Sequence, residues 1–366
     1  MNPFINHLGN GITDPYIAKN TDCVPVKAEL VWQDAPSLVT DIKYNSGTNG
    51  GTISFKVDKE NIRQGNALIA IKDSQNTILW SWHIWITDEN IYHTIKVTNH
   101  QNVSHDLMPI HLGWCEGEVI NYAARSCQVQ FIAHGQTRLI TVNQMRSTTS
   151  TQGNCTFYEW GRKDPLRPSS GYAYKNKTWY NAAGIASTAN HAVESFPFGN
   201  ECIKNYIRKP DVMQKEIGGD NTYFNLWNAD NNTNSNVYND NPVTKNVYDP
   251  CPVGFAMPPS NTFTGFTTTG ENVTNTVAKY NGEWNSSLPG WNFYCGPNKT
   301  GGTIFFPMTG ERISSGGHLS AVGSLGHTWS ATSTHSNYAH NLTLYTNYWV
   351  CLLYTSPSPR DRSLSR

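Results

Sequence analysis

Residues 66–87 constrain the fold of this chain more than any other segment. They contain two apolar runs, 67–72 and 77–86, on either side of the polar residues 73–76. The second run alternates, with Trp80, Trp82, Ile84 and Ile86 on one face of an extended strand and Leu79, Ser81, His83 and Trp85 on the other. The sequence therefore predicts a β-hairpin that turns at 73–76.

Several other short runs in the first half follow the same pattern. The segments 127–133 and 137–142 predict a second hairpin that turns at 134–136, and 28–33 and 51–57 predict further strands. Six or seven such strands at intervals of about ten residues favour a β-sandwich of immunoglobulin type. We expect this domain to cover residues 27–145.

The tryptophans of 77–86 have two interpretations, because flat aromatic faces also stack on sugar rings. Both faces of this strand carry apolar residues, which favours a position in the core. His83 is interpreted as a half-buried, hydrogen-bonded core histidine, since no second histidine or carboxylate stands beside it at metal spacing.

The composition narrows the class of protein. Charged residues make up 15% of the chain and aromatic residues 12%, with 29 Gly and 19 Pro, which favours short strands, tight turns and ordered loops. The formal net charge is zero and there is no basic run, so we expect no nucleic-acid partner. No run of about 18 apolar residues is present, so we expect no membrane span.

The second half is predicted to be a loop-rich domain. Small polar residues dominate 143–156, so we place a linker at 146–156 and a second domain at 157–350. At most short helices are expected there, within 182–194 or 195–206. The Asn-rich residues 228–241 predict a long surface loop.

Prolines shape the segment from 250 to 259. They fix φ and remove backbone donors, so this segment suits a rigid turn and not a central strand. We expect Gly254 to adopt a special backbone conformation, Phe255 to be anchored in the core, and Ser260 to act as the N-cap of a short helix. The segment therefore predicts architecture and not catalysis.

Four motifs in a fixed order carry a resemblance to known proteins. They are YEWGRKDP at 158–165, FNLWNA at 224–229, VYDPCPVGFAMPP at 247–259 and TWSAT at 328–332. Together they resemble the C-terminal region of fimbrillin-type cell-surface lipoproteins of the Bacteroidetes. They are also similar to secreted modules with a C-type-lectin-like or formylglycine-enzyme-like core.

This resemblance implies a mainly β chain in which the immunoglobulin-like sandwich precedes a loop-rich α+β C-type-lectin-like domain. It implies a non-catalytic, exported structural or adhesion protein, a pilus tip or fimbrillin-associated subunit at the outer-membrane surface or on a fimbrium. The implied partners are other pilus or surface subunits. The motif residues that we expect to be structural are Trp160, Gly161, Arg162, Asp164, Trp227, Asp249, Cys251, Gly254, Phe255 and Trp329, with Arg162 paired to a carboxylate or carbonyl beneath the aromatic cluster.

The alternative function is binding of host or dietary glycans at the cell surface. Trp179, Tyr180, Trp284 and Trp291 are the candidate ligand-binding residues, because they lie in polar, Gly- and Asn-rich surroundings and are expected to be exposed.

An enzyme of formylglycine-oxidase type is a distant alternative. Such enzymes need closely placed copper-binding cysteines, and no motif around Cys251 or Cys295 matches them. The chain also lacks the GxSxG, P-loop, HExxH and strand-linked GxGxxG patterns. We predict no cofactor and no metal. The loop at 228–241 has oxygen ligands that could bind calcium, but a solvated loop is favoured.

The positions of the eight cysteines do not decide which of them form disulfides. The spacing does not fit zinc. Cys115 and Cys127 either bridge neighbouring strands or remain two buried thiols. The cysteines are Cys23, Cys115, Cys127, Cys155, Cys202, Cys251, Cys295 and Cys351.

Neither end of the sequence is predicted to be a natural terminus of the protein. Residues 1–26 look like the remnant of an upstream region, so an export signal is expected before them. Residues 351–361 can be encoded by a string that matches a transposon-library sequencing adapter, so 351–366 is interpreted as adapter translation. We therefore expect an extended, poorly contacting tail after about Val350 and an unpaired strand edge at 342–345.

Overall fold

The computed structural model describes residues 5–12, 20–47, 51–60, 62–150, 152–197, 199–215, 225–231, 238–274, 277–335, 338–346 and 349–357. Over these ranges the chain is mainly β, and the one α-helix among them, α1 (Asn200–Arg208), confirms part of the helix expected within 195–206. No helix in the described ranges has the length and apolarity needed to span a bilayer. The short 3₁₀-helices are η2 (Ser260–Phe266), η3 (Val277–Lys279) and η4 (Pro297–Lys299).

The first-half strands build a five-stranded antiparallel sheet with the order β13-β12-β1-β4-β5. The predicted hairpin at 66–87 is confirmed as β4 and β5. Its turn forms because Asp73 Oδ1 accepts the backbone N–H groups of Gln75 at 3.0 Å and Thr77 at 2.7 Å, while Asn76 takes a φ of 68°. The strands are β1 (Lys27–Gln33), β4 (Gly65–Lys72), β5 (Ile78–Ile86), β12 (Trp179–Tyr180) and β13 (Ala186–Ser187).

This sheet joins segments from both sides of the predicted linker. Gln33 in β1 pairs with Tyr180 in β12. Lys163 of the second half donates to the carbonyl of Ser81 in β5 at 3.1 Å. The division into two domains at 146–156 stays a prediction.

The second half contributes a four-stranded sheet of order β16-β24-β23-β22 and a three-stranded sheet of order β17-β18-β19. Aromatic rings fill the core beneath them, where Phe266 stacks on Phe293 with centroids 4.3 Å apart and Phe306 meets Phe266 edge-on. Each such buried ring contributes about 1.5–3 kcal/mol through burial. The strands are β16 (Val273–Thr274), β17 (Gly282–Asn285), β18 (Gly290–Gly296), β19 (Thr300–Pro307), β22 (Leu325–His335), β23 (Tyr338–Tyr345) and β24 (Trp349–Pro357).

Four small two-stranded sheets complete the main part of the molecule. They are β2 (Thr40–Asn45) with β3 (Thr52–Lys56), β6 (Ile95–Thr98) with β7 (Ser104–Leu107), β14 (Val193–Glu194) with β15 (Met213–Gln214), and β20 (Glu311–Arg312) with β21 (Leu319–Ser320).

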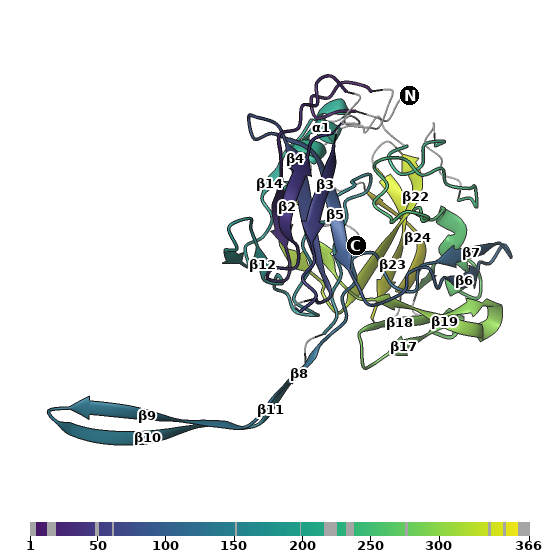
Figure 1. The fold of residues 1–366 in the computed structure, drawn as a ribbon. Helices are drawn as coiled ribbons and strands as arrows, with labels where there is room; N and C mark the ends of the chain where they lie inside the picture. Colours follow the sequence, from purple (N-terminus) through teal and green to yellow (C-terminus); the bar gives the residue numbers. More distant parts are fainter. Residues whose placement is uncertain are drawn as a thin grey trace.

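A long two-stranded ribbon projects away from all these sheets (Figure 1). We call residues 119–150 the arm and the remainder the body. In the arm, β8 (Val119–Tyr122) pairs with β11 (Ser147–Ser150), and β9 (Arg125–Ala133) pairs with β10 (Gln136–Gln144).

The arm both confirms and corrects the sequence prediction. The hairpin with a turn at 134–136 is confirmed, with left-handed φ values of 47° at His134 and 75° at Gly135. Its expected place in a β-sandwich is wrong, because residues 119–148 are all exposed and, within the part of the chain that the structure describes, β9 and β10 pair only with each other. Alternation in a sequence indicates that a strand has an apolar face, but it does not say what covers that face.

The C-terminal prediction is also wrong for the part of the tail that the structure describes. β24 runs from Trp349 to Pro357 along the edge of β23, with Val350 opposite Leu344 and Thr355 opposite His340. The edge at 342–345 is thus paired. Strand addition uses backbone donors and acceptors, so it does not depend on the origin of the side chains. Residues 358–366 lie outside the described ranges.

Candidate interaction site

The strand register divides the arm into two unlike faces. Val129 lies opposite Ile140, and Cys127 lies opposite Val142. Directly opposed residues project from the same side of a ribbon, so these side chains share one face. We call it the apolar face of the arm: Cys127, Val129, Phe131, Ile140 and Val142, with Arg138 opposite Phe131. The other face is mainly polar and carries Ser126, Gln128, Gln130, Thr137, Thr141 and Asn143, with Ile132 and Leu139 near the tip.

The apolar face is open to solvent along its whole length. Phe131 is 54% exposed, and Ile140 and Val142 are each 52% exposed. A two-stranded hairpin is only marginally stable in water unless it packs on something else. Contiguous exposed apolar side chains of this kind mark an interaction surface.

Charge separates the arm from the body. Three of the 27 Lys and Arg residues lie on the arm, at Arg125, Arg138 and Arg146, and none of the 27 Asp and Glu residues does. The arm therefore carries a formal charge of +3 and the body −3. Two arms repel each other weakly, whereas an arm and a body attract.

A second feature lies at the root of the arm. There, Cys115 and Asn154 exchange two backbone hydrogen bonds of 2.9 Å, and the nearby Leu112 and Cys155 line a cavity of about 180 Å³. We call it the aromatic cavity. Its aromatic lining residues are His111, Phe157, Tyr158, Trp227, Phe255, Phe263, Phe305, Phe306, His327 and Trp329.

Burial makes several titratable groups around this cavity uncharged at neutral pH. The pKa of His111 is lowered to about 4, and its ring meets Phe306 edge-on at 4.8 Å. Burial raises the pKa of Tyr158 and of Cys251 well above their ordinary values, and the carboxylate of Asp249 adds to the shift at Cys251. The acidic residue in the lining is Asp106, which is exposed.

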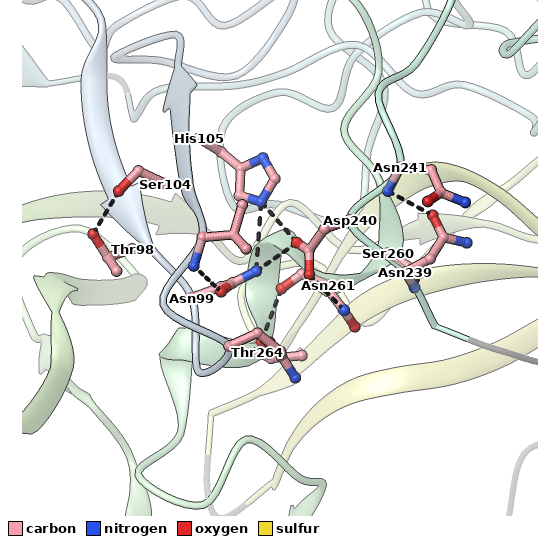
Figure 2. Close-up of polar contacts among 12 residues, drawn as sticks. Thr98, Asn99, Ser104, His105, Asn239, Asp240, Asn241, Ser260, Asn261 and Thr264 are labelled. Carbon is pink, nitrogen blue, oxygen red and sulfur yellow. Dashed lines mark hydrogen bonds and ion pairs between the residues drawn. The ribbon is translucent and has the colours of Figure 1, made fainter.

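A half-buried polar network, shown in Figure 2, lies next to one wall of the cavity. Asp240 accepts hydrogen bonds from Asn99 at 2.6 Å and from Asn261 in η2 at 2.8 Å, and its carboxylate lies 3.0 Å from His105 Nε2 in β7. The cavity-lining residues that begin at Asp106 follow His105 directly, so the network fixes their position.

This network also bears on the predicted loop at 228–241. In the part that the structure describes, 228–231 and 238–240 contain no helix or strand and are half-buried or exposed, as expected for a surface loop, and 238–240 is also hydrogen-bonded to β7 and η2. The oxygens of Asp240 face N–H donors, whereas calcium takes oxygen ligands. Among the described residues, no group of three His, Cys, Asp or Glu is placed to hold a metal, and 232–237 lie outside them.

Arg162 makes the pairing with a carboxylate and with carbonyls that was expected of it. Its guanidinium is fully buried and donates to Glu159 Oε2 at 2.6 Å, to the carbonyl of Val212 at 2.8 Å and to the carbonyls of Lys209 and Pro210. The charge also lies 5.0 Å from the ring centroid of Tyr206. Arg162 thus ties its own segment to the end of α1 and the residues that follow it.

The other residues of the first and fourth motifs are buried around this arginine. Trp160 packs on Trp227 with centroids 5.6 Å apart, and Trp329 donates to the carbonyl of Tyr158 at 2.9 Å. Gly161 has a φ of 81°, and a Cβ there would lie 2.4 Å from Leu226. Buried Asp164 lies 2.5 Å from the ammonium of Lys163 and accepts the Ser81 hydroxyl at 2.9 Å.

The proline-rich motif is organised by the buried side chain of Asp249. Its carboxylate accepts the backbone N–H of Cys251 at 2.8 Å and of Met257 at 2.9 Å. Gly254 has a φ of 88°, so its expected special conformation is confirmed. Phe255 is not in the core: it is half-buried, packs on Tyr92 at 5.6 Å and lines the aromatic cavity. The prolines keep this turn at the surface, so the Phe255 ring reaches the cavity wall and not the core.

A short helix does begin at Ser260, but its expected cap is wrong. Pro259 occupies the N-cap position of η2, and no side-chain cap bond forms there. The Ser260 hydroxyl instead accepts the backbone N–H of Asn239 at 3.0 Å. Ser260 therefore serves as a hydrogen-bond acceptor for the 238–241 segment and does not cap the helix.

The four candidate glycan-binding residues do not form one site. Trp179 and Tyr180 lie in β12, whereas Trp284 and Trp291 lie opposite each other in β17 and β18, well away from β12 (Figure 1). The guanidinium of Arg167 covers the Trp179 ring at 4.0 Å, and Tyr180 is half-buried in the sheet.

The two tryptophans of β17 and β18 differ in burial. Trp291 is only 3% exposed, so its expected exposure is wrong: it alternates into the core and faces Tyr280 at 5.1 Å. Trp284 is 37% exposed and rests with its edge on Trp291 at 5.7 Å. Trp284 is therefore the member of the set that presents an open aromatic surface.

No bridge joins Cys115 and Cys127, and the interpretation as buried thiols is right for Cys115 and wrong for Cys127. Both thiols are free, Cys115 is buried at the arm root, and Cys127 is exposed on the apolar face of the arm. The two cysteines flank the stretch where the chain leaves the body, which separates them in space. The expectation for His83 is confirmed, because it is half-buried between Asn66 Oδ1 and the Tyr158 hydroxyl, each at 2.9 Å.

Two features were missed at the sequence level. One is the arm as a free element, for which the signal was the combination of alternation with three arginines and no acidic residue in 119–150. The other is a buried cluster in which Arg312 donates to Asn176 Oδ1 at 2.7 Å and Arg167 contacts His191 at 3.1 Å. No local pattern indicates that cluster, since its members are far apart in the chain.

No protein-family model matches the chain, and no curated protein or solved structure matches it. Its function is therefore argued from its own residues.

Proposed function

We propose that this chain is a non-catalytic, exported structural or adhesion protein of the cell surface, a pilus-tip or fimbrillin-associated subunit that joins other protein subunits through its arm. One observation carries the proposal: an ordered β-ribbon with a continuous apolar face that the body does not cover. The four motifs support the fimbrial setting and a position at the outer-membrane surface or on a fimbrium. They also support the finer fold, an immunoglobulin-like sandwich followed by a C-type-lectin-like domain.

The energetics of the arm favour docking. A ribbon of two 16-residue strands is roughly 50 Å long and 10 Å wide, so one face covers roughly 500 Å². Hydrophobic burial at about 25 cal/mol per Å² of apolar surface makes such a face worth several kcal/mol once it is covered. That gain is lost in a free monomer, which is why an interaction function fits this element better than a purely structural one.

The groups around the aromatic cavity support a non-catalytic role. A catalytic acid, base or nucleophile works best when its pKa lies near the working pH. Burial instead lowers the pKa of His111 to about 4 and raises that of Cys251 well above its ordinary value. Both side chains are thereby held in their neutral forms.

The test uses fimbriae sheared from the cells that produce the chain. The complete chain should bind them, and a variant in which 119–150 is replaced by a short Gly-Ser turn should not. The Cys115–Asn154 backbone pair closes the arm root in this variant, so the body is expected to stay folded. Val129→Asn with Ile140→Thr should weaken binding on the apolar face, while Gln128→Ser with Thr141→Ser on the polar face serves as the matched control. Equal binding by the armless variant would refute the proposal.

A glycan-binding function is the second candidate, and the open surface of Trp284 favours it. Stacking of a pyranose ring on that surface predicts binding to a glycan array that disappears in Trp284→Ala. Tyr180→Ala is the comparison, because Tyr180 lies half-buried in another sheet. Undiminished array binding by Trp284→Ala would remove this candidate.

A further inference from the structure

We propose that the arm docks on a second copy of this chain, with the Phe131 ring in the partner copy's aromatic cavity and the two copies exchanging arms about a two-fold axis. This inference rests on the proposed function, because it takes the arm as the docking element and names its partner. Four observations support it: cavity size, reach, charge and area.

The cavity has the size and lining for one aromatic ring. Its volume is about 180 Å³, and Phe157, Phe263 and Phe306 are among its walls. An apolar cavity of about 150 Å³ is large enough to hold benzene. Phe131 is the one aromatic side chain on the apolar face of the arm, and more than half of it is exposed.

The arm cannot fill the cavity of its own chain. Phe131 lies 12 residues along the ribbon from Val119, which places it roughly 40 Å from the root. The ribbon runs away from the body (Figure 1). The cavity, by contrast, lies near the root, where Leu112 and Cys155 are among its lining residues. The ring must therefore enter the cavity of another molecule.

The same geometry favours a closed pair of molecules. Because each cavity lies at the root of an arm, an arm that spans to a partner's cavity ends where the partner's arm begins. The partner's arm then runs back antiparallel and ends at the first cavity. This reciprocal contact is self-complementary about a two-fold axis, the commonest symmetry of soluble oligomers.

The charges agree with this arrangement. Arg138 is the cross-strand neighbour of Phe131, so it arrives at the cavity together with that ring. Asp106 lines the cavity and pairs at the surface with Lys96 at 3.0 Å, and Glu116 and Glu118 are exposed just before the arm begins. Antiparallel exchange places Arg138, near the tip of each arm, beside these acidic residues, which parallel stacking of two arms does not do.

The buried area approaches that of a stable interface. In this arrangement the two arms lie antiparallel along each other, so each buries one face of roughly 500 Å², or roughly 1,000 Å² in total, and the two tips add their contacts at the partner cavities. Specific, stable interfaces bury about 1,200–2,000 Å².

The first experiment is a mixed disulfide between two different chains, in a background of Cys127→Ser and Cys251→Ser. One chain carries Phe131→Cys and an affinity tag, and the other carries Ala256→Cys, since Ala256 lines the cavity. Mild oxidation should yield a tagged cross-linked pair. Ile132→Cys is the control, because Ile132 projects from the opposite face of the same strand. Cross-linking of the Phe131→Cys chain no faster than that of the Ile132→Cys chain would overturn the proposal.

The second experiment measures molar mass by light scattering across a dilution series. The complete chain should elute with twice its 40.9 kDa mass and the armless variant as a monomer. Phe131→Ala should weaken the dimer about tenfold or more, as expected for a buried aromatic anchor. Ile132→Ser should change it less. Arg138→Glu should also weaken the dimer, and Asp106→Arg in the same chain should restore part of it.

The outcomes separate this inference from the proposed function. A complete chain that stays monomeric at all concentrations, yet needs its arm to bind fimbriae, overturns the second-copy inference and leaves the proposed function standing. A monomeric chain whose armless variant binds fimbriae equally well overturns both.

Discussion

Replacing Arg162 by methionine tests whether the buried motif cluster holds the body together. Methionine keeps much of the volume but removes the charge and every donor. Glu159, which is almost fully buried, then loses the cation that lies 2.6 Å from it. The carbonyls of Val212, Lys209 and Pro210 lose their donor as well.

The expected loss of stability comes mainly from the carboxylate of Glu159, which is left buried without its cation. Breaking a buried ion pair by removing one partner costs about 3–5 kcal/mol. The total stability of a domain is about 5–15 kcal/mol, so this loss removes a large part of it. The individual hydrogen bonds are not added to this figure, because contacts within one network are not independent.

Urea unfolding followed by tryptophan fluorescence measures the loss, since Trp160 and Trp227 lie beside the substituted residue. The double variant Glu159→Gln with Arg162→Met should recover part of the stability, because no charge is then left unpaired. Lys56→Met is the control, since Lys56 pairs with Asp41 at the surface and should leave the midpoint unchanged. If Arg162→Met lowers the free energy of unfolding by less than about 1 kcal/mol, while the dependence of that free energy on urea concentration is unchanged, this reasoning is refuted.

Two further predictions concern burial and pH. Trp291→Ala should cost about 3–5 kcal/mol in urea unfolding, whereas Trp284→Ala should cost far less; equal losses would contradict the assigned packing. Burial lowers the pKa of His83 to about 3 and of His111 to about 4, both below the value of about 6.5 for an unfolded chain. The unfolded state therefore binds more protons between pH 6.5 and 4, so stability should fall as the pH falls through this window, by at most about 1.4 kcal/mol per pH unit for each histidine. His83→Gln should flatten that dependence, and an unchanged slope would show that His83 is not held neutral.

Local chemistry explains which parts of the fold were predictable from the sequence. The hairpin at 66–87 combines alternation with a turn that Asp73 and Asn76 stabilise by themselves. The burial of Arg162 was predictable too, because it lies among aromatic residues within its own motif. The hairpin turn depends on residues close together in the chain, as does the pair of Arg162 with Glu159, whereas the carbonyls that Arg162 also reaches come from a distant segment.

Other features depend on contacts with distant segments of the chain or with another molecule, and local sequence patterns do not indicate such contacts. Trp291 seemed exposed because Gly290 and Asn292 flank it, yet neighbours along a strand project to opposite faces. The apolar face of the arm was recognised as a strand pattern, but the pattern does not distinguish a covering sheet in the same chain from another molecule. The aromatic cavity was not predicted, since its walls come from six separate segments.

Hydrogen–deuterium exchange on the arm tests the central claim most directly. The measurement compares the backbone amides of β9 and β10 in the dilute chain, in the concentrated chain and in the chain bound to fimbriae. We expect rapid exchange of these amides in the dilute chain, because a free two-stranded ribbon opens readily, and strong protection once the arm is docked. Body strands β4 and β5 should be protected in all three states. Rapid exchange of β9 and β10 in every state, including the fimbria-bound one, would contradict the claim that the arm is a docking element.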